Sequence, residues 1–190
     1  MTANALDAFI GQCRAIMAGA NEPAAIVRRV APLMRNLLLG PRDFLRSEHF
    51  QSDPAHYARN AVYTSPDDTL SLFALVWLPG QWTPVHDHGS WGVVGILSGV
   101  IEERGYMSID GEIRNDFGIR LKEGGMTLLP EGAVTTFVPN PDHIHVTGVP
   151  KDRATAISLH LYGRNMNSFH IYDLANGSRR LVDVPHYRSR

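Results

Sequence analysis

Hydrophobic residues near the start of the chain recur at helical spacing and predict two amphipathic helices. Residues 5–19 place apolar side chains every three or four positions, with Asn4 as a plausible cap. The second helix, over 23–40, opens on a proline, which suits the first helical position, while Pro32 should kink or restart it. A third, short helix is expected over 43–49, and these segments are expected to cover one side of the barrel that follows.

From Tyr57 onward the apolar period changes to two, which is typical of β-strands. Turn signals separate the strands at Asp67-Asp68, Pro79-Gly80, Ser98-Gly99, Asp110-Gly111, Glu123-Gly124, Glu131-Gly132 and Asn140-Pro141. Several short strands separated by regularly recurring turns predict a closed antiparallel β architecture. A turn at Asn176-Gly177 predicts one more edge strand within the last segment.

The length favours one domain over residues 1–190, because 190 residues suffice to bury a core. Within it we expect a helical segment over 1–50, a barrel over 57–163 and a C-terminal extension over 164–190. A net charge of -1, with both signs interspersed, gives no reason to expect binding to nucleic acid or to an anionic membrane.

The cysteine content and the hydropathy pattern bear on location. A single cysteine, Cys13, excludes an internal disulfide framework and fits a reducing compartment. It lies on the apolar stripe of the first helix, so a buried core residue is favoured over a reactive thiol. No signal-like opening or apolar run of about 20 residues is present, and we expect a cytoplasmic protein.

Candidate chemistry begins with two histidines, His86 and His88, that follow a turn at Pro79-Gly80. In an extended strand, residues two apart point to the same side, so this pair could bind one metal ion. Asp87 lies between them, and its side chain should face away from the ion. A purely structural role for the pair is the weaker alternative.

A third ligand could come from His143 or His145, which would share one face of a strand. Three neutral imidazoles would leave a divalent ion with its full charge, and such a site favours an anionic, chelating substrate. Nitrogen ligands with open coordination positions suit Fe(II), and an Fe(II) that binds both substrate and O2 is an oxygenase.

Two spaced motifs resemble the two-part signature of the cupins. The first runs from Gly80 to His88, and the second from Gly124 to Gly132, with a later histidine. The resemblance implies a mainly β fold, a cupin (double-stranded β-helix, or jelly-roll) barrel with the N-terminal α-helices packed on it and a metal ion inside. Where the cupin pattern has a glutamate after the histidine pair, this chain has Gly92 and Val93.

Three polar residues alternate with apolar ones near the end of the predicted barrel: Ser158, His160 and Tyr162. They therefore share one face of a strand, and polar groups on the inner face of a small barrel usually have a function. The alternative is the ordinary exposed face of an edge strand.

The chain further resembles the thiol dioxygenases, cysteine dioxygenase type I and its bacterial relatives. Four motifs carry this resemblance in family order: Tyr57-x-Arg59-Asn60, His86-Asp87-His88, Ile144-His145 and Ser158-x-His160-x-Tyr162. It implies that His86, His88 and His145 bind Fe(II), which favours His145 over His143. It also implies a catalytic relay of Ser158, His160 and Tyr162.

The resemblance implies a reaction in which both atoms of O2 are added to the sulfur of a thiol, giving a sulfinic acid without an external reductant. Arg59 could bind a substrate carboxylate bidentately. Relatives with an arginine here use cysteine, whereas those with a glutamine prefer 3-mercaptopropionate. Arg164 could be a second anion contact, as for mercaptosuccinate, or a loop charge. Trp91 could form a wall of the pocket or pack in the core.

One departure from the animal enzymes is clear, because no cysteine lies near Gly92 and Val93 to crosslink with Tyr162. Tyr162 is therefore expected to be unmodified. The expected partners are a small thiol and O2, in a monomer or a small homo-oligomer. The alternatives are a non-enzymatic ligand-binding cupin and another metal-dependent cupin, although an isomerase or decarboxylase would be expected to have the missing glutamate.

Overall fold

The computed structural model describes residues 5–139 and 143–183. Its helical elements are α1 (Ala5–Ala18), α2 (Pro23–Leu39) and the 3-10 helix η1 (Ser47–Phe50). Its strands are β1 (Ala58–Thr64), β2 (Ser71–Trp77), β3 (Gly92–Ser98), β4 (Val100–Ser108), β5 (Leu121–Pro130), β6 (Val134–Phe137), β7 (Ile144–Gly148), β8 (Ala156–Tyr162), β9 (Ser168–Asp173) and β10 (Ser178–Asp183). The predicted cap Asn4, the predicted turn at Asn140-Pro141 and the end of the C-terminal extension lie outside the described residues.

The two helices form at the predicted places and bury the predicted stripes. The buried residues of α2 are Ile26, Val27, Val30, Met34, Leu37 and Leu38. The helix nevertheless runs through Pro32 without a break, so the expected restart was wrong. Pro32 and Arg28 are both exposed, and the carbonyl that loses its partner to the proline therefore lies on the side facing water. Neither α-helix in the described ranges has the length and apolarity needed to span a membrane.

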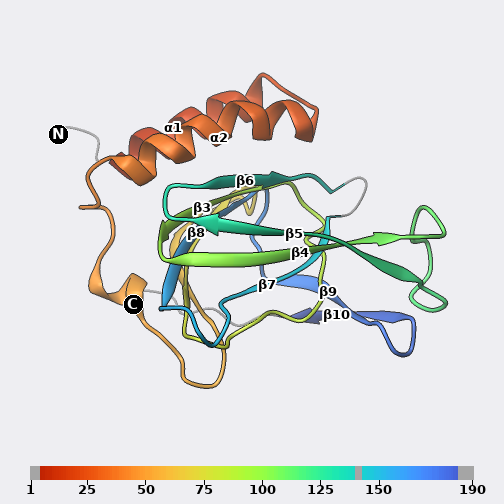
Figure 1. The fold of residues 1–190 in the computed structure, drawn as a ribbon. Coiled ribbons are helices and arrows are strands. Elements are labelled where there is room, and N and C mark those ends of the chain that lie inside the picture. Colours follow the sequence, from red (N-terminus) through yellow and green to blue (C-terminus); the bar gives the residue numbers. More distant parts are fainter. Residues whose placement is uncertain (1–4, 140–142, 184–190) are drawn as a thin grey trace.

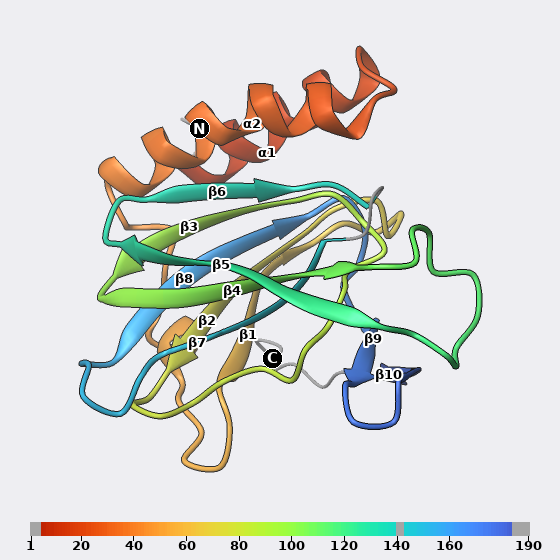
Figure 2. The same cartoon turned by 45° about the vertical axis from the view of Figure 1, so that its right-hand side comes forward.

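The strands form two main antiparallel sheets and a separate hairpin. The larger sheet has the order β1-β2-β8-β3-β6, and the smaller has the order β5-β4-β7. Strands β9 and β10 pair with each other, and the predicted Asn176-Gly177 turn joins them. Helix α2 packs over β3 and β6, and α1 packs against α2, on one side of the barrel (Figure 1); the turned view shows the same arrangement (Figure 2). This mainly β architecture with two N-terminal helices confirms the predicted cupin fold.

The larger sheet separates two apolar clusters. Leu159 and Leu161 of β8 belong to the cluster beneath the helices, whereas Tyr162 of the same strand belongs to the cluster inside the barrel. The period of two therefore sorts the side chains of β8 as expected. Because β8 lies between β2 and β3, the alternative of an exposed edge strand was wrong.

Two local predictions failed. The turn expected at Glu123-Gly124 lies inside β5, where the pairing with β4 shifts register between Arg104 and Tyr106. A glycine opposite a bulge in an exposed strand gives the same sequence signal as a turn. The short helix expected over 43–49 is only the single 3-10 turn η1.

Candidate metal centre

The segment between β2 and β3 carries the histidine pair. The prediction of an extended strand was wrong, because His86 makes only isolated bridges and His88 lies in irregular chain. The amide of His86 donates to the carbonyl of His145 (2.9 Å), and the amide of His145 donates back to His86 (3.0 Å). On the other side, Asp87 N donates to the His170 carbonyl (3.2 Å). Hydrogen bonds on both sides therefore hold the pair in place without a regular strand.

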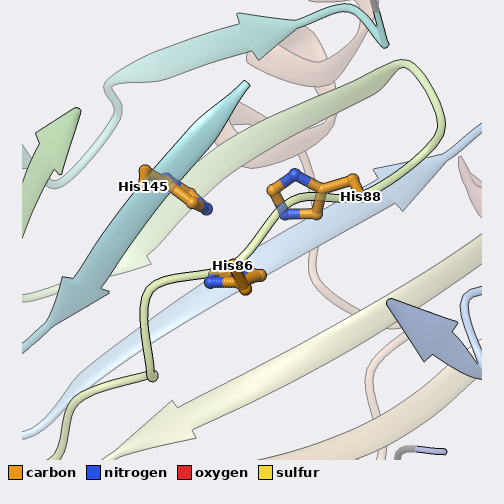
Figure 3. A group of neighbouring side chains, drawn as sticks. All are labelled: His86, His88 and His145. Atoms are coloured by element: carbon orange, nitrogen blue, oxygen red, sulfur yellow. The ribbon is translucent and has the colours of Figure 1, made fainter. Parts of the chain in front are cut away.

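Three imidazole rings converge inside the barrel. Each of His86, His88 and His145 offers a ring nitrogen, and these atoms all lie within 4.8 Å of one another. Their exposed fractions are 5%, 4% and 3%. The ring nitrogens turn toward a common centre (Figure 3). The structure thus brings together the three predicted ligands, from the segment before β3 and from β7, without a carboxylate in the group.

The protonation of these rings suits a metal ion. Burial lowers the pKa of His86 and of His145 to about 3, and lowers that of His88 well below its usual value. All three rings are therefore neutral near pH 7, and each keeps one lone pair. His86 Nδ1 lies 3.1 Å from the Pro84 carbonyl, which can only accept, so the proton is on Nδ1 and Nε2 is free.

Burying the ring nitrogens of His88 and His145 without a hydrogen-bond partner costs free energy. Nδ1 of His88 and Nε2 of His145 have no hydrogen-bond partner among the described residues, and Nδ1 of His145 faces only the carboxylate of Glu103, 2.9 Å away. Buried polar atoms of this kind call for an ion, a ligand or water. The donor set, three neutral imidazoles around one point, fits a divalent transition metal with open coordination positions.

Glu103 of β4 was missed by the sequence analysis. Its Oε2 lies 2.9 Å from Nδ1 of His145, and its Oε1 lies 3.7 Å from Nε2 of His143. Glu103, His143 and His145 form a second possible metal group, but it shares His145 with the first. A neutral imidazole has only one lone pair, so both groups cannot hold an ion at once. Glu103 instead lies behind His145, where a carboxylate commonly orients a metal-binding histidine.

His143 lies one residue before β7 and outside the three-histidine group. It was expected to be a histidine satisfied by hydrogen bonds, yet its Nε2 has no such partner among the described residues. Its ring stacks on Phe137, with centroids 5.3 Å apart. Its Nε2 lies 3.7 Å from Oε1 of Glu103.

Asp87 faces the side away from the three rings, as expected. Its carboxylate accepts hydrogen bonds from the backbone amide of His170 (3.1 Å) and from the Tyr172 hydroxyl (2.9 Å). The His170 ring lies 3.1 Å away through Nδ1. The residue between the two candidate ligands thus ties their segment to β9.

A small cavity adjoins the rings. Its volume is about 20 Å³, which is room for roughly one water molecule. The lining residues are Tyr57, Arg59, Leu75, Trp77, Thr83, His86, His88, Val94, His145, Thr147, His160, Tyr162 and Phe169. No carboxylate belongs to this lining, so an anionic ligand would meet no like charge at the cavity wall.

Arg59 of β1 places an unpaired cation at this cavity. Only 5% of the residue is exposed. Its Nη2 donates to the Met166 carbonyl (2.6 Å), and its guanidinium lies 4.8 Å from the centroid of the Phe73 ring. Nη1 has no partner among the described residues. A buried charge of this kind is costly until an anion pairs with it, so the site is suited to a carboxylate.

A chain of hydrogen bonds runs along the inner face of β8. Ser158 Oγ lies 2.8 Å from His160 Nε2, and His160 Nδ1 lies 3.1 Å from the Tyr162 hydroxyl. Trp77 of β2, which the sequence analysis missed, donates from Nε1 to Ser158 Oγ (2.9 Å). These contacts join the three predicted residues in one hydrogen-bonded chain, with Trp77 as a fourth member at its Ser158 end.

A family model described as cysteine dioxygenase type I matches residues 2–175 of this chain. The chain belongs to the cysteine dioxygenase type I family. Its assembled histidines, Arg59 and hydrogen-bonded chain on β8 are therefore features of a thiol dioxygenase family member.

Solved structures similar to this family member have low sequence identity. The protein TT1209 from Thermus thermophilus is 22% identical, with 60% of this chain and 89% of that chain covered and a TM-score of 0.44. An uncharacterized double-stranded β-helix protein from Klebsiella pneumoniae is 16% identical, with 76% and 100% covered and a TM-score of 0.46. An oxalate oxidase in complex with glycolate is 14% identical, with 66% and 62% covered and a TM-score of 0.45. Similarity this low has no bearing on the substrate.

Two residues predicted as substrate contacts of a thiol dioxygenase lie outside the cavity lining. Arg164 donates to the carbonyls of His88 (3.2 Å) and Ser168, so it holds the loop after β8 against the histidine segment. Trp91 belongs to the cluster beneath the helices, and its indole lies against Gly163. The alternatives of a loop charge and of core packing therefore describe their contacts better.

Proposed function

We propose that this member of the cysteine dioxygenase type I family is an Fe(II)-dependent thiol dioxygenase acting on a small thiol that carries a carboxylate. The observation that carries this proposal is the convergence of three buried, neutral imidazoles beside an unpaired buried arginine. The reaction joins one thiol and one O2 into one sulfinic acid, so its atoms balance without a further reductant. Cysteine is the proposed substrate, and 3-mercaptopropionate and mercaptosuccinate share its thiol and carboxylate.

Different residues would bind the metal ion, bind the substrate and donate a proton. His86, His88 and His145 would hold the iron, which supplies binding positions for a thiolate and for O2 and lowers the pKa of the thiol. Arg59 would bind the substrate carboxylate and so fix the direction in which the thiol points. Tyr162 lines the same cavity and would offer its hydroxyl to the reacting groups.

Oxygen uptake by the iron-loaded protein tests this function. We expect uptake with cysteine, 3-mercaptopropionate or mercaptosuccinate, and little with cysteamine, which lacks the carboxylate. A ligand-binding cupin without enzymatic activity would bind a thiol and consume no oxygen. Turnover of cysteamine equal to that of the best carboxylate thiol would remove the assigned role of Arg59.

The Tyr162→Phe variant removes only a hydroxyl group from the cavity. We expect kcat to fall by about 100-fold, the lower end of what a positioned proton donor contributes, with little change in KM. The measurement is initial oxygen uptake over a range of thiol concentrations, together with the ratio of sulfinic acid formed to oxygen consumed. An undiminished rate and ratio would show that the hydroxyl has no such role.

The Glu103→Gln variant keeps the shape of the side chain but removes the charge behind His145. We expect the affinity for a divalent metal to fall by about 10- to 100-fold, as for other carboxylates that orient a metal-binding histidine. Competition with a chelator of known affinity measures this change. Glu102→Gln is the matched control, because Glu102 is the preceding residue of β4 and pairs with Arg104 (2.7 Å). Equal losses in the two variants would contradict the role of Glu103.

A further inference from the structure

The hydrogen-bonded chain on β8 begins at a group that can only donate. Trp77, Ser158, His160 and Tyr162 have exposed fractions of 0%, 0%, 6% and 4%, so little water reaches them. An indole N–H has no acceptor atom. Ser158 Oγ must therefore accept the 2.9 Å hydrogen bond from Trp77 Nε1.

Ser158 has one proton of its own, and its direction follows from the partners available. Within the described residues, its hydroxyl contacts only Trp77 and His160. If His160 also donated to Ser158, the serine proton would be buried without an acceptor, which is the costly arrangement. The serine proton therefore lies on the 2.8 Å contact to His160 Nε2, which accepts it.

The protonation of His160 determines the direction of the next hydrogen bond, to Tyr162. Burial, with the nearby Arg59 guanidinium, lowers the pKa of His160 well below its usual value, so the ring is neutral and carries one proton. With Nε2 accepting, that proton is on Nδ1 and is donated to the Tyr162 oxygen over 3.1 Å. The tyrosine proton is then free to point into the cavity, where a ligand or a water molecule can accept it.

We propose that Trp77 is a positioning residue that sets the direction of hydrogen-bond donation from Ser158 through His160 to Tyr162. As a result, Tyr162 presents a proton and not a lone pair to the cavity. The opposite direction would turn the tyrosine proton back onto His160 and leave the cavity with an acceptor. The catalytic value of this arrangement rests on the proposed dioxygenase function, but the arrangement itself does not.

Nitrogen NMR of histidine-labelled, full-length protein loaded with zinc tests the direction without requiring activity. We expect the His160 ring, assigned by its loss in His160→Gln, to have a protonated Nδ1 and a bare Nε2. A protonated Nε2 would overturn the proposal. If this tautomer is found but no thiol is oxidised, the proposed function fails while the inference about Trp77 stands.

Trp77→Phe removes the indole donor and keeps an aromatic ring against Tyr57, whose centroid lies 4.6 Å from that of Trp77. We expect the His160 tautomers to become mixed and kcat to fall about tenfold, with KM changed less than about twofold. Trp82→Phe makes the same chemical change outside the cavity lining and should alter neither the His160 tautomer nor kcat.

Ser158→Ala breaks the same chain at its next member and should also mix the tautomers, so the test does not depend on one variant folding. An unchanged His160 tautomer in either folded variant would reduce Trp77 to a packing residue and overturn the proposal.

Discussion

Replacing His88 with glutamine is expected to lower the affinity for iron by more than about 100-fold and to abolish thiol-dependent oxygen uptake. Loss of a residue that merely orients a metal ligand costs about 10- to 100-fold, so loss of a ligand should exceed that range. His88 is 4% exposed and contributes one of three converging nitrogens, and two imidazoles cannot enclose the ion in the same way. Metal analysis after dialysis and chelator competition give the affinity.

His56→Gln is the control for this variant. His56 has a side chain that is 58% exposed and lies near Asp53, apart from the three converging rings. It should leave metal content and oxygen uptake unchanged. Iron bound by His88→Gln as tightly as by the unaltered protein would remove His88 from the metal centre.

Replacing Arg59 with glutamine is expected to lower kcat/KM for carboxylate thiols by about 30-fold or more. Removing one partner of a buried charge pair typically costs about 2–5 kcal/mol or more, and the lower figure corresponds to roughly that factor. The low rate with cysteamine should stay nearly the same, because that thiol has no carboxylate for the guanidinium to bind. The quantity to measure is therefore the ratio of kcat/KM for a carboxylate thiol to kcat/KM for cysteamine.

Arg59→Lys separates charge from geometry at the same position. A lysine keeps the positive charge but lacks the planar fork that pairs bidentately with a carboxylate. We expect it to recover only part of the lost kcat/KM. Equal losses for cysteamine and for the carboxylate thiols would mean that Arg59 supports the barrel and not the substrate.

The electrostatics of the metal centre depend on where the nearest carboxylate lies. The three converging nitrogens are neutral and would leave the charge of a divalent ion uncancelled, as the missing cupin glutamate implied. Glu103 lies near them but behind His145, at its far ring nitrogen. There it could strengthen His145 as a ligand without joining the three converging nitrogens.

The sequence predicted those features that depend on local periodicity. The apolar stripe of α2 and the alternation along β8 each repeat within a few residues, and both are confirmed. The histidine pair was predicted for a partly mistaken reason. His86 and His88 face the same centre because bridges to His145 and Ile171 hold their segment, and not because they lie in a strand.

What the sequence could not predict depends on which strands become neighbours. Glu103 reaches His145 because β4 pairs with β7, and Trp77 reaches Ser158 because β2 pairs with β8. Neither pairing has a local signal, since the partners are far apart in the chain. The contacts of Arg164 have no local signal either, because the carbonyls that accept from it belong to His88 and to Ser168 at the start of β9.

The most direct test of the proposed dioxygenase activity is to supply isotopically heavy O2 to the iron-loaded protein with its best thiol. The mass of the product is then measured by mass spectrometry. We expect a sulfinic acid in which both oxygen atoms come from O2, one molecule for each O2 consumed. A product that carries oxygen from water, or a disulfide formed together with hydrogen peroxide, would contradict it.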